Sequence, residues 1–416
     1  MIKFIHTSDI HLDSPLRGLE YYEGAPVDSI RGATRQAFKN LVELAISEKV
    51  DFILIAGDLY DGDWKDYNTG LFFASQMSKL REAGIRVFIV SGNHDAASRI
   101  SRRLRMPENV KVFSAKKPET ITIDDLDIAI HGQSFARQAI TEDMSTAYPD
   151  AITGHLNIGI LHTSAAGCEG HEPYAPCSVE GLLSKGYDYW ALGHVHKREI
   201  LHEDPWIIFS GCIQGRHIRE IGEKGCTLVS ADDGRITEVE HKEIDVLRWS
   251  IGSVDVSEAE NVGDVVDLVS AVLEEEAGKS DGRPLALRLM IKGNSKAHAG
   301  LIANPEQCIN DIREVATDIS TGDIWIEKVK IKTAAQIDIE EMRNRDDAIG
   351  ELLRAIDNLS IDRESLSGMM DEFSDLKRKL PVELRQGEDS INLDDPEQLE
   401  EIIADVKQIL FARLFT

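Results

Sequence analysis

Residues that can bind metal ions occur in this sequence in short clusters, each directly after an apolar, β-rich run. In the segment 89–95 (Ile-Val-Ser-Gly-Asn-His-Asp), the apolar run ends at a glycine and is followed by an amide, an imidazole and a carboxylate. The same construction recurs in the segments 4–11, 52–61, 158–162 and 189–196. Parallel strands of α/β proteins carry ligand-binding side chains at the carboxyl edge of their sheet. We therefore expect strands from distant parts of the chain to bring these side chains together.

Seven of these side chains have the chemistry of ligands for hard or borderline divalent metals: Asp9, His11, Asp58, Asn93, His162, His194 and His196. Carboxylate, amide and imidazole donors without thiolate suit Mn, Fe, Zn or Mg. This set is larger than one ion needs and suffices for two ions that share a carboxylate. Two ions about 3.5–4 Å apart can stabilise both the attacking and the leaving oxygen of a displacement at phosphorus. His94 then serves best without metal, as a proton donor to the leaving oxygen or as a cation beside the phosphoryl group.

In their order along the chain, the five clusters resemble the five signatures of the calcineurin-like metallophosphoesterases. The segments 7–12 and 91–95 resemble those of DNA-repair exonucleases, nuclease subunits that work with a coiled-coil ATPase at double-strand breaks. The segments 170–177 and 187–196 are more similar to the YhaO-type branch than to the SbcD-type nuclease subunit. The resemblance covers residues 1 to about 245, and beyond that point it extends only to the layout of the chain.

The resemblance implies a role for each side chain. One ion would be held by Asp9, His11, Asp58 and His196, and the other by Asp58, Asn93, His162 and His194. Mn²⁺ is the favoured metal, with Mg²⁺, Fe²⁺ and Zn²⁺ as alternatives. His94 corresponds to the catalytic histidine of the family. Asp61 stands where phosphatase relatives place the carboxylate that orients this histidine, whereas archaeal break-repair nucleases carry a second histidine there.

Composition and periodicity predict three regions in the 416 residues. In residues 1–245, the pattern predicts helices near 29–49 and 67–83 between the first strands and many short strands after residue 110. The resemblance implies that this region is a metallophosphoesterase domain. Residues 246–335 read as a small α+β capping domain, and residues 336–416 as an acidic, helical C-terminal region. The expected fold class is α/β, a metallophosphoesterase two-sheet sandwich flanked by helices, followed by the cap and the helical region.

The formal net charge of −27 at first argues against a nucleic-acid partner, because Lys and Arg drive phosphate binding. The charge is unevenly distributed, since residues 1–120 carry 17 basic and 16 acidic groups and residues 336–416 carry 10 and 21. A basic run follows the central cluster and begins with Arg99, Arg102, Arg103 and Arg105. Its position near the site favours contact with a DNA backbone, and the alternative is an ordinary solvated helix face.

The sequence shows no run with the apolar length of a membrane span and no pattern of a secretion signal. Its five cysteines are odd in number and widely spaced, which suits neither a disulfide framework nor a thiolate zinc site. We therefore expect a cytoplasmic protein with reduced thiols and no membrane partner.

These features favour a two-metal DNA exonuclease or endonuclease that acts in DNA repair as the nuclease partner of a coiled-coil ATPase. The C-terminal helices would then dock the ATPase or form a homodimer, or simply pack within the core. One alternative is a phosphodiesterase of the same fold that acts on a small molecule, which the overall acidity favours. The other is a non-catalytic DNA-binding scaffold, against which the complete ligand set counts.

Overall fold

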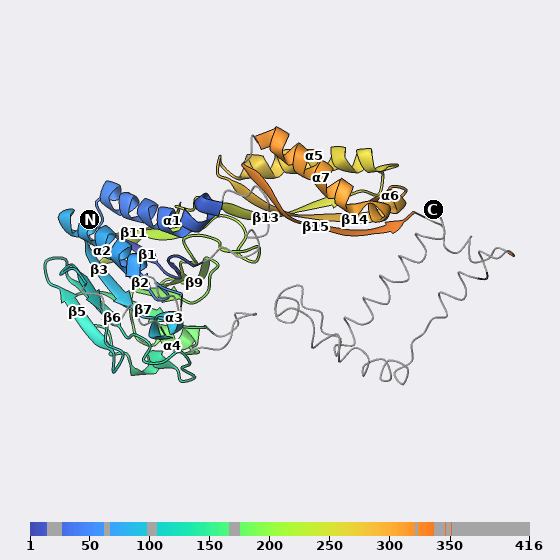
Figure 1. Cartoon of the computed structure of the whole chain (residues 1–416). Coiled ribbons are helices and arrows are strands. Elements are labelled where there is room, and N and C mark those ends of the chain that lie inside the picture. Colours follow the sequence, from blue (N-terminus) through green and yellow to red (C-terminus); the bar gives the residue numbers. More distant parts are fainter. Residues whose placement is uncertain are drawn as a thin grey trace. The chain divides into compact units, whose positions relative to one another are not determined.

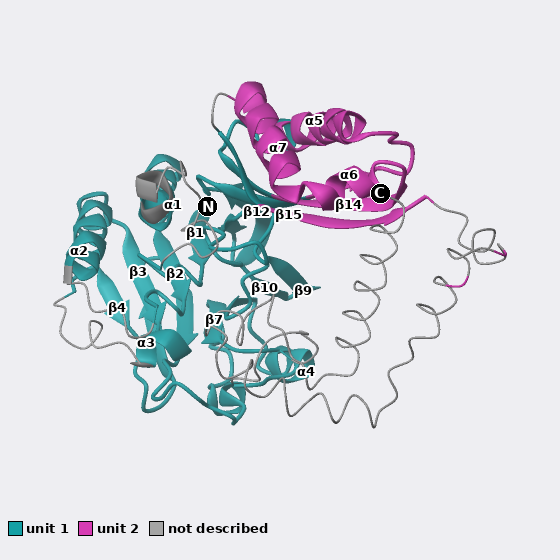
Figure 2. Cartoon of the chain, turned by 45° about the vertical axis from the view of Figure 1, so that its right-hand side comes forward, with its two compact units in different colours: residues 1–251, 278–287, 323–327 teal, residues 252–277, 288–322, 328–416 magenta. Residues whose placement is uncertain are grey.

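The structure is a computed structural model that describes residues 1–14, 27–61, 67–97, 106–165, 175–320 and 323–336, with the single positions 346 and 351. The chain divides into two compact units (Figure 2). The first comprises 1–251, 278–287 and 323–327, and the second comprises 252–277, 288–322 and the chain from 328 onward. No helix among the described residues is long and apolar enough to cross a lipid bilayer.

The first unit contains a six-stranded sheet in the order β12-β11-β1-β2-β3-β4. Its strands are β1 (Ile2–Thr7), β2 (Phe52–Ala56), β3 (Arg86–Val90), β4 (Val110–Val112), β11 (Gly225–Asp232) and β12 (Arg235–Glu243). Strands β1 to β4 are parallel, whereas β11 pairs antiparallel with β1 and β12 pairs antiparallel with β11. The carboxyl ends of β1, β2 and β3 therefore lie side by side at one edge.

A second six-stranded sheet has the order β5-β6-β7-β8-β10-β9. Its strands are β5 (Glu119–Ile123), β6 (Ile128–Gly132), β7 (Leu156–His162), β8 (Tyr189–Gly193), β9 (Glu199–Glu203) and β10 (Trp206–Phe209). Strands β6, β7, β8 and β10 are parallel, and the two edge strands are antiparallel to their neighbours.

An apolar core joins the two sheets face to face. Phe4 and Leu54 from the first sheet pack in one cluster with Ile158, Tyr189 and Ile208 from the second, and all five are fully buried. Burial on both faces explains why these strands are continuous apolar runs rather than alternating ones. The two sheets thus form a sandwich, which confirms the predicted α/β fold class for the described residues.

Helices cover the outer faces of the sandwich (Figure 1). Helices α1 (Val27–Glu48) and α2 (Tyr67–Glu82) confirm the two predicted helices and pack on the first sheet, with Phe38 and Phe73 in the shared core. The short 3-10 helix η1 (Met144–Ala147) and α4 (Val179–Leu183) pack on the second sheet beside Trp190. A single-turn helix, α3 (Asn93–Ala97), begins directly after β3.

A third sheet of three strands, β13 (Arg248–Asp255), β14 (Leu285–Ser295) and β15 (Ile324–Ala335), continues into the second unit. Its helices are α5 (Val262–Lys279), α6 (His298–Ala303) and α7 (Pro305–Ser320). These elements match the α+β pattern expected for residues 246–335. The domain limits at 245 and 335 stay predictions, and the predicted C-terminal helices lie outside the described residues.

Candidate metal centre

The predicted ligands lie at one edge of the sandwich, where strands of both sheets end. The first sheet supplies Asp9 and His11 after β1, Asp58 and Asp61 after β2, and Asn93 and His94 at the start of α3; the second supplies His162 at the end of β7, and His194 and His196 after β8. Donor atoms that lie within 4.8 Å of one another form three groups. Two of them contain only predicted ligands and are called the donor groups below: Asp9 with His11 and His196, and Asp58 with His162 and His194. The third joins His11 to Asp61 and His94.

Hydrogen bonding at the far nitrogen fixes the orientation of His162. Its Nδ1 lies 2.9 Å from the carbonyl oxygen of Ala56, so this nitrogen carries the proton and donates it. The lone pair on Nε2 then faces Asn93 Oδ1 at 2.9 Å and Asp58 Oδ2 at 3.5 Å. Three lone pairs that converge in this way repel one another unless a cation lies among them. This donor set therefore fits a bound metal ion.

His196 is arranged in the same way in the other group. Its Nδ1 lies 2.6 Å from Glu220 Oε1, and its Nε2 lies 3.2 Å from His11 Nε2 and 3.7 Å from Asp9 Oδ1. With metal–nitrogen bonds of about 2.0–2.1 Å, two ligands of one ion are separated by about 3.0–3.4 Å. The spacing of the two imidazoles fits this requirement.

Asp58 faces both groups of donors. Its Oδ2 lies 3.5 Å from His162 Nε2 and 3.9 Å from His11 Nε2, while its Oδ1 accepts a hydrogen bond from the backbone N–H of His94 at 3.0 Å. This is the position expected of a carboxylate that two ions share.

Burial shapes the ionisation of these groups. Burial and the nearby charge of Asp9 raise the pKa of Asp58. Burial also acts to raise the pKa of Asp9, but the pKa is lowered overall by the charges of His196 and His162 when these imidazoles are protonated in the metal-free protein, and by hydrogen bonds from Ser8 and from the backbone N–H of His194. Burial lowers the pKa of His11 well below its usual value, which favours the neutral imidazole that a metal requires.

The backbone is strained at four of the predicted ligands. The φ angle is +49° at Asp9, +44° at His11, +52° at Asp58 and +106° at His194. Residues other than glycine rarely adopt this left-handed backbone conformation, which costs about 1–3 kcal/mol of free energy per residue. Hydrogen bonds from Asp9 N to Gly57 O and from His11 N to Asp58 O, both 3.0 Å, hold the two loops together. Such strain is typical of functional sites.

Two glycines permit the close packing of this edge. A Cβ atom on Gly193 would lie 1.9 Å from the carbonyl oxygen of Ala56, and one on Gly92 would lie 2.3 Å from Asp58 Oδ1. No side chain fits at either position, so both glycines are needed to bring the strand ends of the two sheets into contact.

Asp95 ties the loops after β2 and β3 to each other. Its buried carboxylate accepts hydrogen bonds from the backbone N–H groups of Leu59 at 3.1 Å, Tyr60 at 2.9 Å and Gly92 at 3.1 Å. Three donors from two loops fix the position of both, and with them the adjacent Asp58 and Asn93.

His94 lies beside the donor groups, paired with Asp61. Its Nδ1 is 3.1 Å from Asp61 Oδ1, and Ser14 Oγ donates to Asp61 Oδ2 at 2.8 Å. The hydrogen bond with Asp61 raises the pKa of His94 although burial lowers it, and the same bond lowers the pKa of Asp61. The imidazole is oriented by a carboxylate while 37% of its side chain stays exposed.

Sequence reasoning missed Glu220. This residue lies in the loop between β10 and β11, is 5% exposed and contacts His196. Nothing in the sequence marks it among 73 acidic residues, because its role depends on a contact between positions that are 24 residues apart.

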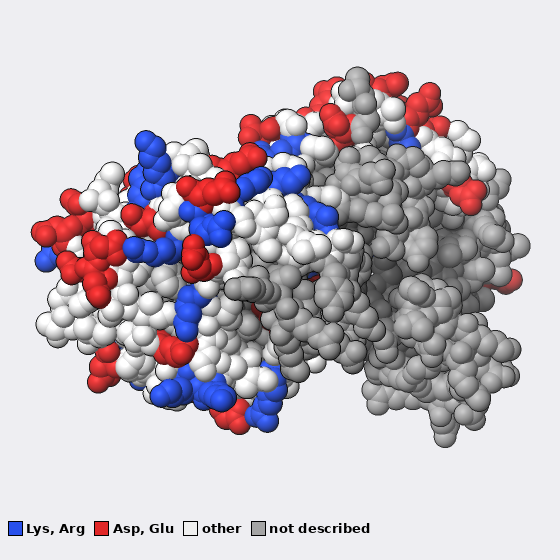
Figure 3. Space-filling model, turned by 60° about the vertical axis from the view of Figure 1, so that its left-hand side comes forward, with Lys and Arg blue, Asp and Glu red and all other residues white. Residues whose placement is uncertain are grey.

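The predicted DNA-binding residues Arg99, Arg102, Arg103 and Arg105 lie outside the described residues. On the face drawn in Figure 3, the Lys and Arg side chains of the described residues are interspersed with Asp and Glu.

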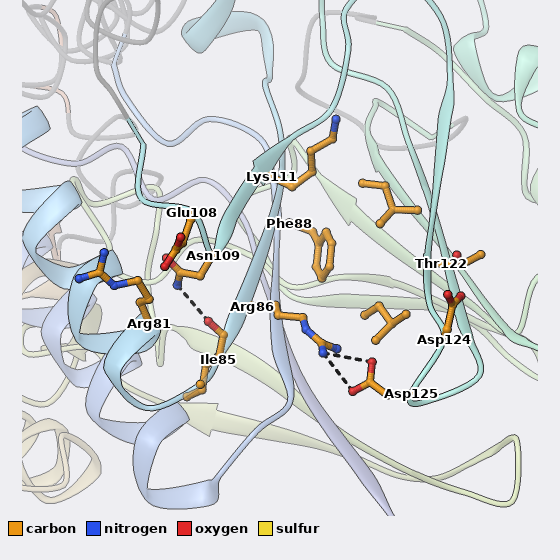
Figure 4. Close-up of a pocket in the computed structure, with 13 residues that line it drawn as sticks. Arg81, Ile85, Arg86, Phe88, Glu108, Asn109, Lys111, Thr122, Asp124 and Asp125 are labelled. Carbon is orange, nitrogen blue, oxygen red and sulfur yellow. Dashed lines mark hydrogen bonds and ion pairs between the residues drawn. The ribbon is translucent and has the colours of Figure 1, made fainter.

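A pocket of about 620 Å³ shares no residue with the donor groups (Figure 4). Phe88 lies in it beside Arg86, which pairs with Asp125 at 3.0 Å, and Lys111, which pairs with Glu119 at 3.3 Å. Arg86 and Lys111 are already paired with carboxylates. The pocket is therefore a weaker candidate for the functional site than the edge that carries the predicted metal ligands.

The Asp61→Asn substitution should lower the pKa of His94 in the metal-free protein, measured by NMR titration of the imidazole. The ion pair raises the pKa of His94 and lowers that of Asp61. It therefore stabilises the folded protein above about pH 4, where Asp61 is ionised, and this stabilisation is lost as the pH rises through the pKa of His94. The exposed Asp124→Asn serves as the control. An unchanged pKa of His94 in the Asp61 variant would show that this carboxylate does not orient the imidazole.

Comparison with known proteins identifies the family of the chain. Residues 2–198 match the calcineurin-like phosphoesterase family, and residues 249–334 match the middle domain of the metallophosphoesterase YhaO. The chain is 33% identical over 377 residues to a Bacillus subtilis (strain 168) protein described as an uncharacterized metallophosphoesterase YhaO, with 89% of each chain covered.

Two further proteins are more distantly similar. The DNA double-strand break repair protein Mre11 of Methanopyrus kandleri is 24% identical over 355 residues, which cover 77% of this chain and 73% of that protein. A solved dimetal phosphatase from Danio rerio aligns with 58% of this chain and 96% of its own, at 11% identity and a TM-score of 0.35. The match to the Bacillus protein, together with the two matching regions, places this chain in the YhaO-type branch of the calcineurin-like metallophosphoesterases.

Proposed function

We propose that this metallophosphoesterase is a two-metal DNA nuclease that acts in DNA repair. Family membership makes it a metal-dependent phosphoester hydrolase. The observation that carries the proposal is the pair of donor groups beside an oriented His94, with Asp58 Oδ2 facing His162 of its own group and His11 of the other. The DNA substrate is supported by similarity to a relative described as a double-strand break repair protein.

Each ion would have four ligands: Asp9, His11, Asp58 and His196 for the first, and Asp58, Asn93, His162 and His194 for the second. We favour Mn²⁺, which suits mixed oxygen and imidazole donors. Such ions supply electrostatic stabilisation to the oxygens of a phosphodiester under attack.

In this proposal, His94 supplies the proton that the leaving oxygen needs. Asp61 accepts from Nδ1 and turns the opposite nitrogen, Nε2, away from itself. A raised pKa keeps the imidazolium populated closer to neutral pH, so Nε2 carries a proton to donate.

Two rival functions are hydrolysis of a small phosphodiester and DNA binding without catalysis. A small-molecule phosphodiesterase is favoured by the net charge of −27 and by the acidic groups interspersed among the cations in Figure 3. A DNA-binding scaffold without activity would have no use for two groups of metal-type donors.

The decisive assay is Mn²⁺-dependent cleavage of end-labelled duplex DNA beside hydrolysis of bis(4-nitrophenyl) phosphate. We expect both reactions, and we expect His94→Gln to lower kcat by about 10²- to 10⁴-fold without loss of bound Mn²⁺. His155→Gln, a histidine outside the donor groups, should leave kcat unchanged. Turnover of the small phosphodiester without DNA cleavage would establish the first rival, and binding of DNA with neither reaction would establish the second.

The basic run after the central cluster is proposed to track the DNA backbone. Replacing Arg102, Arg103 and Arg105 by Glu should weaken duplex binding and lower its salt dependence, while hydrolysis of bis(4-nitrophenyl) phosphate is retained. Fluorescence anisotropy at several salt concentrations measures this effect. Equal loss of binding and of small-substrate hydrolysis would contradict it. The control reverses three other cations: Lys39 in α1, Lys49 directly after α1 and Arg81 in α2.

The regions beyond residue 245 are proposed to position substrate and partner. Residues 246–335 would act as a cap that grips the substrate, and residues 336–416 would dock a coiled-coil ATPase in a helix-in-groove mode or form a homodimer. Deletion of 338–416 should abolish co-purification with the ATPase partner while hydrolysis of bis(4-nitrophenyl) phosphate persists. Unchanged co-purification would rule out docking through this region.

A further inference from the structure

The far side of His196 is held by the buried residue Glu220 and its partly buried partner Arg216. His196 Nδ1 lies 2.6 Å from Glu220 Oε1, and Arg216 Nη2 donates to the same oxygen at 3.0 Å. The other carboxylate oxygen, Oε2, accepts from the backbone N–H of Arg216 at 2.7 Å. Both oxygens of Glu220 are therefore engaged, and its side chain is fixed in one orientation.

These contacts decide which nitrogen of His196 carries the proton. Arg216 Nη2 also lies 3.2 Å from His196 Nδ1, so two assignments are conceivable from distance alone. If Nδ1 accepted from Arg216, its lone pair would face the Glu220 carboxylate at 2.6 Å, which is repulsive. Nδ1 therefore carries the proton and donates it to Glu220, and the lone pair of Nε2 points to His11 and Asp9.

The equivalent position behind His162 is neutral. There the partner of Nδ1 is the backbone carbonyl of Ala56, at 2.9 Å. A carboxylate partner withdraws the imidazole proton more strongly than a carbonyl does, and so makes the opposite nitrogen a better metal ligand. The two donor groups thus differ in the hydrogen-bond partner of one imidazole: a charged carboxylate for His196 and a neutral carbonyl for His162.

Arg216 explains how Glu220 can stay ionised inside the protein. The guanidinium of Arg216 places a positive charge 3.0 Å from Glu220 Oε1, so the buried carboxylate is part of an ion pair. The two side chains are 4% and 12% exposed, so the pair is shielded from solvent. Arg216 Nη1 also lies 3.5 Å from the hydroxyl of Ser14, which donates to Asp61.

We infer that Glu220, held by Arg216, is a positioning residue that strengthens binding of the ion at Asp9, His11 and His196 and leaves the second ion unaffected. The inference rests on the ligand sets proposed above. Partners behind a metal-binding histidine typically account for about 10- to 100-fold in metal affinity.

The test is a titration of the metal-free full chain with Mn²⁺. Binding is measured by calorimetry and by the electron paramagnetic resonance signal of free Mn²⁺. We expect two binding steps in the wild type. Glu220→Gln should weaken one step by about 10- to 100-fold and leave the other unchanged. Glu223→Gln removes an exposed carboxylate from the same loop and should change neither step.

A double-mutant cycle separates this role from a merely structural one. Because Glu220 acts through His196, Glu220→Gln should cause no further loss of affinity in a His196→Gln background. Equal weakening of both steps, additive losses in the double variant, or an unchanged titration of Glu220→Gln would each overturn the inference. If Glu220→Gln does not fold, Arg216→Lys tests the same step, since lysine keeps the charge but cannot span the same contacts.

The same titration distinguishes the inference from the proposed function. A wild-type chain that binds fewer than two Mn²⁺ ions would overturn the ligand sets and the inference together. A chain that binds two ions, shows the selective effect of Glu220→Gln and yet cleaves no DNA would overturn the nuclease proposal alone.

Discussion

Repulsion among buried lone pairs is the constraint on which this structure depends. Imidazole, amide and carboxylate groups from five strand ends are held within a few ångströms of one another, with their unprotonated atoms facing inward. Such an arrangement costs free energy that the surrounding fold must supply or that bound cations must remove. The strained φ angles, the glycines without room for a Cβ and the hydrogen bonds between loops all serve to hold these donors in place.

Apolar packing in the sandwich offsets the free-energy cost of holding the ligands together at this edge. Two extended apolar clusters lie on the faces of the first sheet, one against α1 and α2 and one against the second sheet. The polar ligands lie at the ends of strands or directly beyond them, outside the apolar layers. A strained edge on a well-packed scaffold is the arrangement expected where local strain is part of the function.

Much of the site could be predicted from the sequence because its ligands follow apolar strands directly. Asp58 and Asn93 are placed by parallel neighbours, β2 and β3, whose ends must coincide, and α1 and α2 were visible in the periodicity. The order of the strands could not be predicted from the sequence in the same way. Strand β10 lies between β8 and β9, and β11 pairs with β1 from more than 200 residues away. Those pairings depend on contacts between distant segments, for which one sequence offers no local signal. Glu220 was missed for the same reason.

The three backbone hydrogen bonds accepted by Asp95 have a thermodynamic consequence. They hold residues 57–61 and 91–95 in place once the chain folds, so the conformational entropy of these segments is lost during folding and not during chelation. Coordination at this edge then resembles the filling of a macrocycle whose donors are already oriented, in which affinity comes from preorganisation rather than from closure of the chain around the ion.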